Sequence, residues 1–186
     1  NYDNVLKAVR IINDQEGLAI GARRITISTC GIVPGIQKLA GEGLQVELSV
    51  SLHAAADDLR TRLMPVNRRY PVASLLDTCR EYTQQTGRLI TFEYALIKGV
   101  NDSRAQAEAL AGRLKDFQCR VNLIPLSEVE EYAGRASVPE VSNMFIKVLG
   151  EAGVNATLRS SRGGELNAAC GQLRARHAGG RDARGE

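Results

Sequence analysis

The sequence predicts an α/β fold, in which parallel strands are joined by helical crossovers. The main observation is a regular alternation of β-branched, apolar segments with segments of helical period along the 186 residues. A second is the composition, 44% hydrophobic and 24% charged, which is ordinary for one globular core and excludes collagen-like or wholly disordered chains. A third is that no apolar run approaches the roughly 20 residues of a membrane span, so we expect no membrane contact.

Five elements are expected in the first third of the chain. Residues 3–17 place valine and isoleucine at i, i+4 and i+7 and end in glycine, which predicts an amphipathic helix. Residues 24–29 are rich in β-branched side chains and predict a strand. A proline opens a short helix at 34–41. A second strand is expected at 44–52, and one or two helical turns at 57–64.

A longer helix, a third strand and a further helix come next. Residues 71–87 begin with proline, keep the helical period and end in glycine. Residues 89–97 are apolar enough for a third buried strand. The Asn-Asp-Ser run at 101–103 supplies a cap for a helix that continues to residue 114. Strand and helix therefore keep alternating through the middle of the chain.

The last elements continue the same order. A fourth strand is expected at 119–124, a polar loop at 127–138, a helix opened by proline at 139–150 and a final strand at 154–158. The segment 174–186 holds four arginines and three glycines. This composition predicts a disordered end, with an RNA-contacting arm as the alternative.

Polar side chains recur where the predicted strands end. Ser28, the Ser51-Leu52-His53 stretch and Asn122 occupy such positions, and Glu93 lies within the third strand. One at a time, each has an ordinary structural explanation, and a buried Glu93 requires a partner such as lysine or arginine. Because the carboxyl ends of parallel strands meet at one edge, the group together predicts a site for a polar small molecule.

Several common functional motifs are missing from the sequence. There is no GxxxxGK[ST] or GxGxxG phosphate loop and no GxSxG nucleophile elbow. The net charge of +3 and the 4% aromatic content do not by themselves indicate nucleic-acid binding. The widely spaced cysteines argue against a zinc site or a disulfide framework and favour reduced thiols in a cytoplasmic protein. These cysteines are Cys30, Cys79, Cys119 and Cys170.

Four segments, taken in order, resemble one enzyme family. They are RITISTCGIVP at 24–34, LSVSLHA at 48–54, VNLIP at 121–125 and RGGELNAACGQL at 162–173. They resemble the RNA adenine-C2 methyltransferases of RlmN type, in the radical S-adenosylmethionine superfamily, with a match over residues 1–173. The segments MPVNRRY and GVND also resemble parts of these enzymes.

The resemblance implies a partial (β/α) barrel of radical SAM type, truncated at the N-terminus. It implies an enzyme that transfers a methyl group from S-adenosylmethionine to C2 of adenine in 23S rRNA and tRNA, through a methylated cysteine and radical chemistry. The implied cofactors are S-adenosylmethionine and a [4Fe–4S] cluster, and the implied partners include a reductant protein for that cluster. The family's CxxxCxxC motif does not occur in the sequence. The cysteine ligands of the cluster are therefore expected upstream of this sequence, and the chain alone is expected to be an inactive fragment.

Carried over residue by residue, the motifs assign roles to six positions. Cys170 would carry the methyl group. The S-adenosylmethionine contacts would come from Ser28, Ser51, Leu52, His53 and Asn122. We expect Ser28, Ser51 and Asn122 to face one cavity and strand 24–29 to have an exposed edge. The alternatives are an adenine-C8 methylating relative, a non-catalytic module that binds RNA or S-adenosylmethionine, and an unrelated β/α metabolic enzyme.

Overall fold

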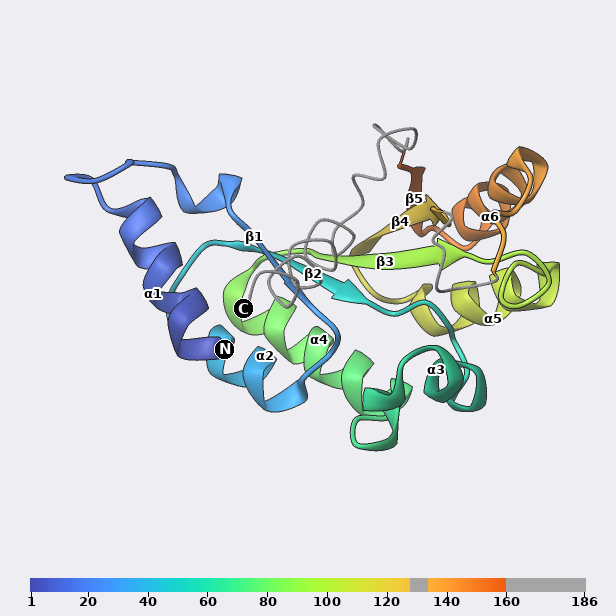
Figure 1. Cartoon of the computed structure of the whole chain (residues 1–186), viewed down its shortest axis with the longest axis horizontal. Helices are drawn as coiled ribbons and strands as arrows, with labels where there is room; N and C mark the ends of the chain where they lie inside the picture. The colour runs from blue at the N-terminus through green and yellow to red at the C-terminus, as the bar shows by residue number, and fades with distance from the viewer. Residues whose placement is uncertain (128–133, 160–186) are drawn as a thin grey trace, which may run out of the picture.

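A computed structural model of the chain describes residues 1–127 and 134–159, and its centre is a parallel sheet (Figure 1). The strands lie in the order β1-β2-β3-β4-β5, and every neighbouring pair is parallel. This arrangement confirms the predicted fold class. The strands are β1 (Thr26–Thr29), β2 (Glu47–Ser51), β3 (Ile90–Leu96), β4 (Cys119–Pro125) and β5 (Asn155–Leu158).

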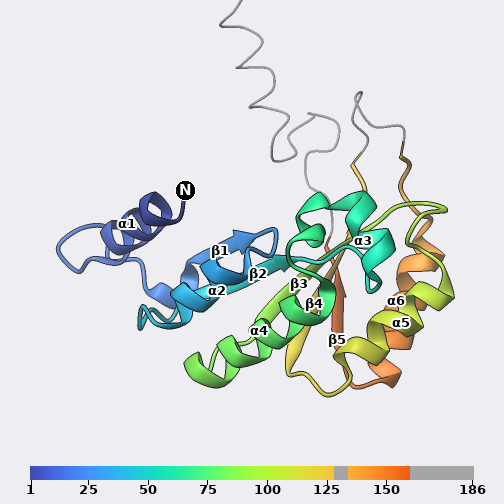
Figure 2. The ribbon, with the colours of Figure 1, turned by 90° about the horizontal axis from the view of Figure 1, so that it is seen from below.

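Helices join the strands, and each lies close to its predicted position. They are α1 (Tyr2–Asn13), α2 (Val33–Ala40), α3 (Asp57–Leu63), α4 (Val72–Thr86), α5 (Arg104–Leu114) and α6 (Pro139–Glu151). Figures 1 and 2 show the chain crossing the molecule in order, with α1 at one end and α5 and α6 at the other. A segment of a β/α barrel is built in this way, from sequential parallel strands with intervening helices.

Strand β2 begins at Glu47 rather than at residue 44, and two other boundaries differ from the sequence prediction for local reasons. Helix α1 ends at Asn13, before the predicted Gly17, because Asp14 turns to an extended conformation and its carboxylate accepts the N–H of Glu16 at 3.0 Å. Strand β1 begins two residues late because Ala22–Arg24 form a 3-10 turn. Neither shift moves a side chain to the other face of the sheet.

The two faces of the sheet differ in polarity. Along β3, Ile90, Phe92 and Tyr94 are fully buried in the hydrophobic core, while Thr91 and Glu93 between them are only half-buried. The core continues into the helices, where α2 packs on α4 and α5 on α6. Because side chains alternate along a strand, the helix-covered face collects the apolar residues and the opposite face keeps the polar ones.

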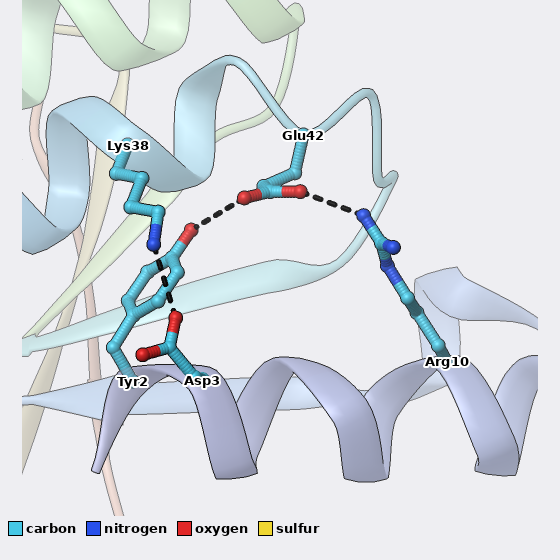
Figure 3. Close-up of polar contacts among 5 residues, drawn as sticks. All are labelled: Tyr2, Asp3, Arg10, Lys38 and Glu42. Carbon is cyan, nitrogen blue, oxygen red and sulfur yellow. Dashed lines mark hydrogen bonds and ion pairs between the residues drawn. The ribbon is translucent and has the colours of Figure 1, made fainter.

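Helix α1 is fastened to the α2 region by exposed and half-buried polar contacts, which we call the α1 latch (Figure 3). Glu42 accepts hydrogen bonds from the hydroxyl of Tyr2 at 3.1 Å and from Arg10 Nη2 at 2.8 Å. Lys38 Nζ donates to Asp3 at 3.0 Å and lies 4.4 Å from the centre of the Tyr2 ring. Burial and the bond to Glu42 raise the pKa of Tyr2 to about 12, so its hydroxyl stays a donor at neutral pH.

Strand β1 forms one edge of the described sheet. It pairs with β2 alone among the described residues, and its four residues alternate between exposed and half-buried. The expected exposed edge is therefore present. No helix of the described residues is long and apolar enough to cross a membrane. The expected disordered tail, 174–186, lies outside the described residues, as does part of the expected loop, residues 128–133.

Candidate functional site

Four polar residues form a row across the open face of the sheet. Ser51 on β2 is in register with Glu93 on β3, Glu93 with Asn122 on β4, and Asn122 with Thr157 on β5. We call Ser51, Glu93, Asn122 and Thr157 the polar row. In a parallel sheet, residues in register lie side by side on the same face. The row therefore brings together Ser51 and Asn122, two of the residues that the sequence singled out.

Hydrogen bonds tie the polar row together. Ser49 Oγ donates to Glu93 Oε1 at 2.7 Å, and Asn122 Nδ2 donates to the same oxygen at 3.2 Å. Thr157 Oγ1 in turn donates to Asn122 Oδ1 at 2.9 Å. The second carboxylate oxygen, Glu93 Oε2, is buried and has no hydrogen-bond partner among the described residues. The lysine or arginine partner expected for Glu93 is replaced by neutral donors to Oε1.

His53 stands just beyond β2 in an unusual conformation. Its φ of 57° lies in the left-handed region, which few residues other than glycine adopt. Its Nδ1 accepts the backbone N–H of Ala95 at 3.0 Å, which places the ring hydrogen on Nε2. Burial and the nearby positive charge of Arg60 lower the pKa of His53 to about 4. The ring is therefore neutral at physiological pH, and its Nε2–H is a donor.

Asn101 connects the ends of β2 and β3. Its Nδ2 donates to the carbonyls of His53 at 2.8 Å and Ala95 at 2.6 Å, and its Oδ1 accepts the N–H of Ile97 at 2.8 Å. The sequence placed Asn101 in a helix cap together with Ser103. Only Ser103 caps α5, by accepting the N–H of Gln106. The fully buried Asn101 instead holds His53 in its left-handed conformation.

Arg60 clamps the carboxyl ends of β1 and β2 from the start of α3. Its fully buried guanidinium donates to the carbonyls of Cys30 at 3.0 Å, Ser51 at 3.1 Å and Leu52 at 3.2 Å. It also donates to Asn67 Oδ1 at 2.9 Å. Burial lowers the pKa of Arg60. The role of Arg60 is not evident from the sequence, where the available signal is the family-like segment 64–70, which contains its partner Asn67.

Gly31 is required by this clamp. Its φ is +97°, and a Cβ at this position would lie 2.9 Å from Leu75 Cδ2 and 3.0 Å from Arg60 Nη2. A larger residue would therefore both strain the backbone and displace the guanidinium. The packing of Arg60 and Leu75 thus explains why glycine is needed at position 31 in the segment ITISTCGIVP.

Ser28 and Leu52 occupy different surroundings from Ser51 and Asn122. Ser28 lines a cavity of about 250 Å³ between α1, β1 and α2, and neither Ser51 nor Asn122 lines it. Ser28 is in register with Ser49, which lies on the same face of β2 as Ser51, so the expectation that Ser28, Ser51 and Asn122 face one cavity stays a prediction. The Leu52 side chain is fully buried in the core, and its backbone bonds to Glu93 and Arg60.

The described cysteines do not form a cluster site. Cys30 is exposed, whereas Cys79 and Cys119 are buried, and burial raises the pKa of each buried thiol to about 12. Over residues 1–127 and 134–159, no three metal-ligating side chains come together. This part of the chain therefore does not fit a [4Fe–4S] cluster. Cys170 lies outside the described residues.

Sequence comparison finds extensive similarity to RNA methyltransferases. No family model matches the chain. A probable dual-specificity RNA methyltransferase RlmN from Moorella thermoacetica is 52% identical over 94% of this chain and 49% of its own length. The one from Symbiobacterium thermophilum is 53% identical over 95% of the chain and 48% of its own length. The chain spans about half the length of the curated relatives it matches.

Solved structures agree with this similarity. A radical SAM methyltransferase from Sphaerobacter thermophilus matches with a TM-score of 0.90 and 51% identity, over 92% of this chain and 50% of that protein. A domain of a pyruvate-formate lyase-activating enzyme from Bacteroides vulgatus shares the fold alone, with a TM-score of 0.63 and 15% identity. The parallel sheet, the sequence identity and this structural match agree with the expected resemblance to a portion of such enzymes. Over nearly its whole length, the chain thus corresponds to about half of an RlmN-type methyltransferase of the radical SAM superfamily, and this is the family to which it belongs.

Proposed function

We propose that this chain forms the S-adenosylmethionine-facing part of an enzyme that methylates C2 of adenine in 23S rRNA and tRNA. The observation that carries the proposal is the polar row, which lies on the open face of the sheet beside His53. Such a row offers hydroxyl, amide and carboxylate groups at one level, as binding of a small zwitterionic ligand requires. The names of the similar proteins support the choice of RNA as the methyl acceptor.

The residues of the row fit S-adenosylmethionine. The buried and unpartnered Glu93 Oε2 is an acceptor that a donor of the ligand can satisfy. The Ser51 hydroxyl and the Asn122 amide flank Glu93 in the row, as groups that bind and orient ribose hydroxyls or amino-acid atoms. When bound, S-adenosylmethionine supplies the methyl group and, after reductive cleavage, the radical.

The surrounding groups keep the site in its binding geometry. Arg60 fixes the carbonyls of Ser51 and Leu52, so the end of β2 cannot move independently of α3. Asn101 fixes the backbone of His53. The neutral His53 ring presents its Nε2–H as a fixed donor across the physiological pH range. Preorganised donors of this kind lower the cost of ordering the site when a ligand binds.

We assign the methyl-carrying role to Cys170 on the basis of the segment NAACGQL alone. A thiolate at this position can be alkylated by a sulfonium, which gives the thioether that the reaction needs. A reductant protein and a [4Fe–4S] cluster held by residues outside this sequence belong to the same proposal. So does a cytoplasmic location, where ribosomal and transfer RNA are found.

A chimaera provides the test. This chain would replace the matching half of the Moorella thermoacetica relative, and the product would be expressed in bacteria that lack adenine-C2 methylation. We expect 2-methyladenosine in both 23S rRNA and tRNA, measured by mass spectrometry of nucleosides. Cys170→Ala should abolish the product while the absorbance of the cluster remains. The matched control is Cys30→Ala, which changes an exposed thiol and should retain the product.

Two results would contradict the proposal. A folded chimaera that makes 8-methyladenosine would assign the chain to the C8-methylating relatives. A chimaera that binds RNA and S-adenosylmethionine but leaves both RNAs unmethylated would favour a non-catalytic binding module. Turnover by Cys170→Ala would refute the role of this cysteine specifically.

A further inference from the structure

Glu93 is a carboxylate without a matching positive charge. It lies in the middle of β3, and its side chain is half-buried on the open face of the sheet. Its contacts are the hydroxyl of Ser49 and the amide of Asn122, both of which are neutral. Among the described residues, no lysine or arginine forms an ion pair with it. Arg120, two residues before Asn122 on the same face, is exposed.

Keeping such a charge away from water is unfavourable unless another charge compensates it. A carboxylate with one buried, unpartnered oxygen loses hydration that two neutral donors to the other oxygen only partly replace. Serine and asparagine also orient the group, because both bind Oε1 and leave Oε2 free. The arrangement therefore keeps a carboxylate acceptor, Oε2, available in the row.

A second carboxylate of the sheet shows what a compensated group looks like. Glu47 lies on the same face of β2, two residues before Ser49. Its Oε1 accepts a hydrogen bond from Arg88 Nη2 at 3.0 Å, so its charge is already paired. Glu47 is at the amino end of the strand and away from the polar row. Glu47 and Glu93 therefore differ in two ways: Glu47 is paired with an arginine and lies outside the polar row, whereas Glu93 has only neutral partners and lies within the row.

We infer that Glu93 is a binding residue that selects the positively charged form of the ligand, so that the site prefers S-adenosylmethionine over S-adenosylhomocysteine. The inference rests on the proposed function. At neutral pH S-adenosylmethionine carries a sulfonium and a net charge of +1, whereas S-adenosylhomocysteine has a neutral sulfur and a net charge of zero. A negative charge in the row attracts the first more strongly than the second, and the low local dielectric enhances the difference. Such a preference would also favour release of a demethylated product from the site.

The test compares the two ligands on the chimaera described above and on its Glu93→Gln variant by isothermal titration calorimetry. The glutamine oxygen can accept the same hydrogen bonds from Ser49 and Asn122, so the substitution removes the charge with little change in shape. We expect the affinity for S-adenosylmethionine to fall at least about tenfold, as for loss of a charged hydrogen bond. The affinity for S-adenosylhomocysteine should change less than about threefold, so the preference between the ligands collapses.

The control is Glu47→Gln, which removes a charge from the same face but outside the row. It should leave the ratio of the two affinities unchanged, and Glu93→Asp, which keeps the charge, should retain the preference. An equal loss of affinity for both ligands in Glu93→Gln, or no loss for either, would overturn the inference while the proposed function stands. A folded chimaera that binds neither ligand would overturn both, because the strand ends would then not form the ligand site.

Discussion

The strand-end network and the α1 latch both hold segments of this chain together with polar side chains, but in opposite environments. The network consists of Arg60, Asn101 and their hydrogen-bond partners, and both residues are fully buried. In the latch, the side chains of Arg10 and Asp3 are 60% and 88% exposed (Figure 3). Water can replace the partners of the latch when it opens, but it cannot reach those of the network. Hydrogen bonds of similar length should therefore differ severalfold in their contribution to stability.

The largest loss of stability is expected when Arg60 is replaced. Arg60→Met keeps much of the side-chain volume but leaves the carbonyls of Cys30, Ser51 and Leu52 without this donor. We expect the free energy of unfolding to fall by about 4 kcal/mol, as for other broken buried polar networks. Denaturant titration followed by circular dichroism would measure this. Arg62→Met on the exposed side of the same helix is the control, and a loss as small as that of the control would contradict the comparison.

A smaller but still large loss of stability is expected when Asn101 is replaced. Asn101→Ala removes two donors and one acceptor that join the backbone of His53, Ala95 and Ile97. We expect a loss of about 3 kcal/mol from the unsatisfied buried groups. The measurement is again the midpoint of denaturant unfolding, with exposed Asn155→Ala as the control. Hydrogen exchange at Ile97 should accelerate in Asn101→Ala if the side chain holds this turn.

His53 should make stability depend on pH. Its pKa is about 4 in the folded chain and 6.5 as its ordinary value, so the unfolded chain binds more protons between these limits. The contribution to stability is therefore fully present above pH 6.5 and is lost as the pH falls towards 4, by between about 2 and 3 kcal/mol. Urea titrations from pH 7 to 4 would measure the slope. His53→Gln should flatten it over this range, and an unchanged slope would refute the assignment.

The smallest effect is expected in the α1 latch. Glu42→Gln weakens the contacts of Glu42 with Arg10 and Tyr2. Because Arg10 is exposed, we expect a loss of less than about 1 kcal/mol, and 0.5 M salt should reduce it further. Differential scanning calorimetry of the variant and of Glu81→Gln, an exposed control on α4, would show the difference. A loss as large as that of Arg60→Met would invalidate the distinction between the two regions.

The sequence predicted the features that depend on local pattern. Each expected strand and helix occurs, because periodicity and caps act within a few residues. The polar row was anticipated in part, since Ser51 and Asn122 were placed at strand ends. The role of Arg60 could not be predicted in this way, because its acceptors come from segments 7 to 30 residues away in the chain. Asn101 was assigned to a cap for the same reason: its local sequence fits one role and its tertiary contacts require another.

Strand β1 has a consequence for how the chain behaves as a solute. Its backbone groups on the side away from β2 have no strand beside them among the described residues, and the cavity next to it is lined mainly by apolar side chains. A second molecule could add a strand at this margin, at the opposite end of the strand order from β5. The tendency of the chain to self-associate at high concentration would then be governed by the four residues of β1, which lie outside the polar row.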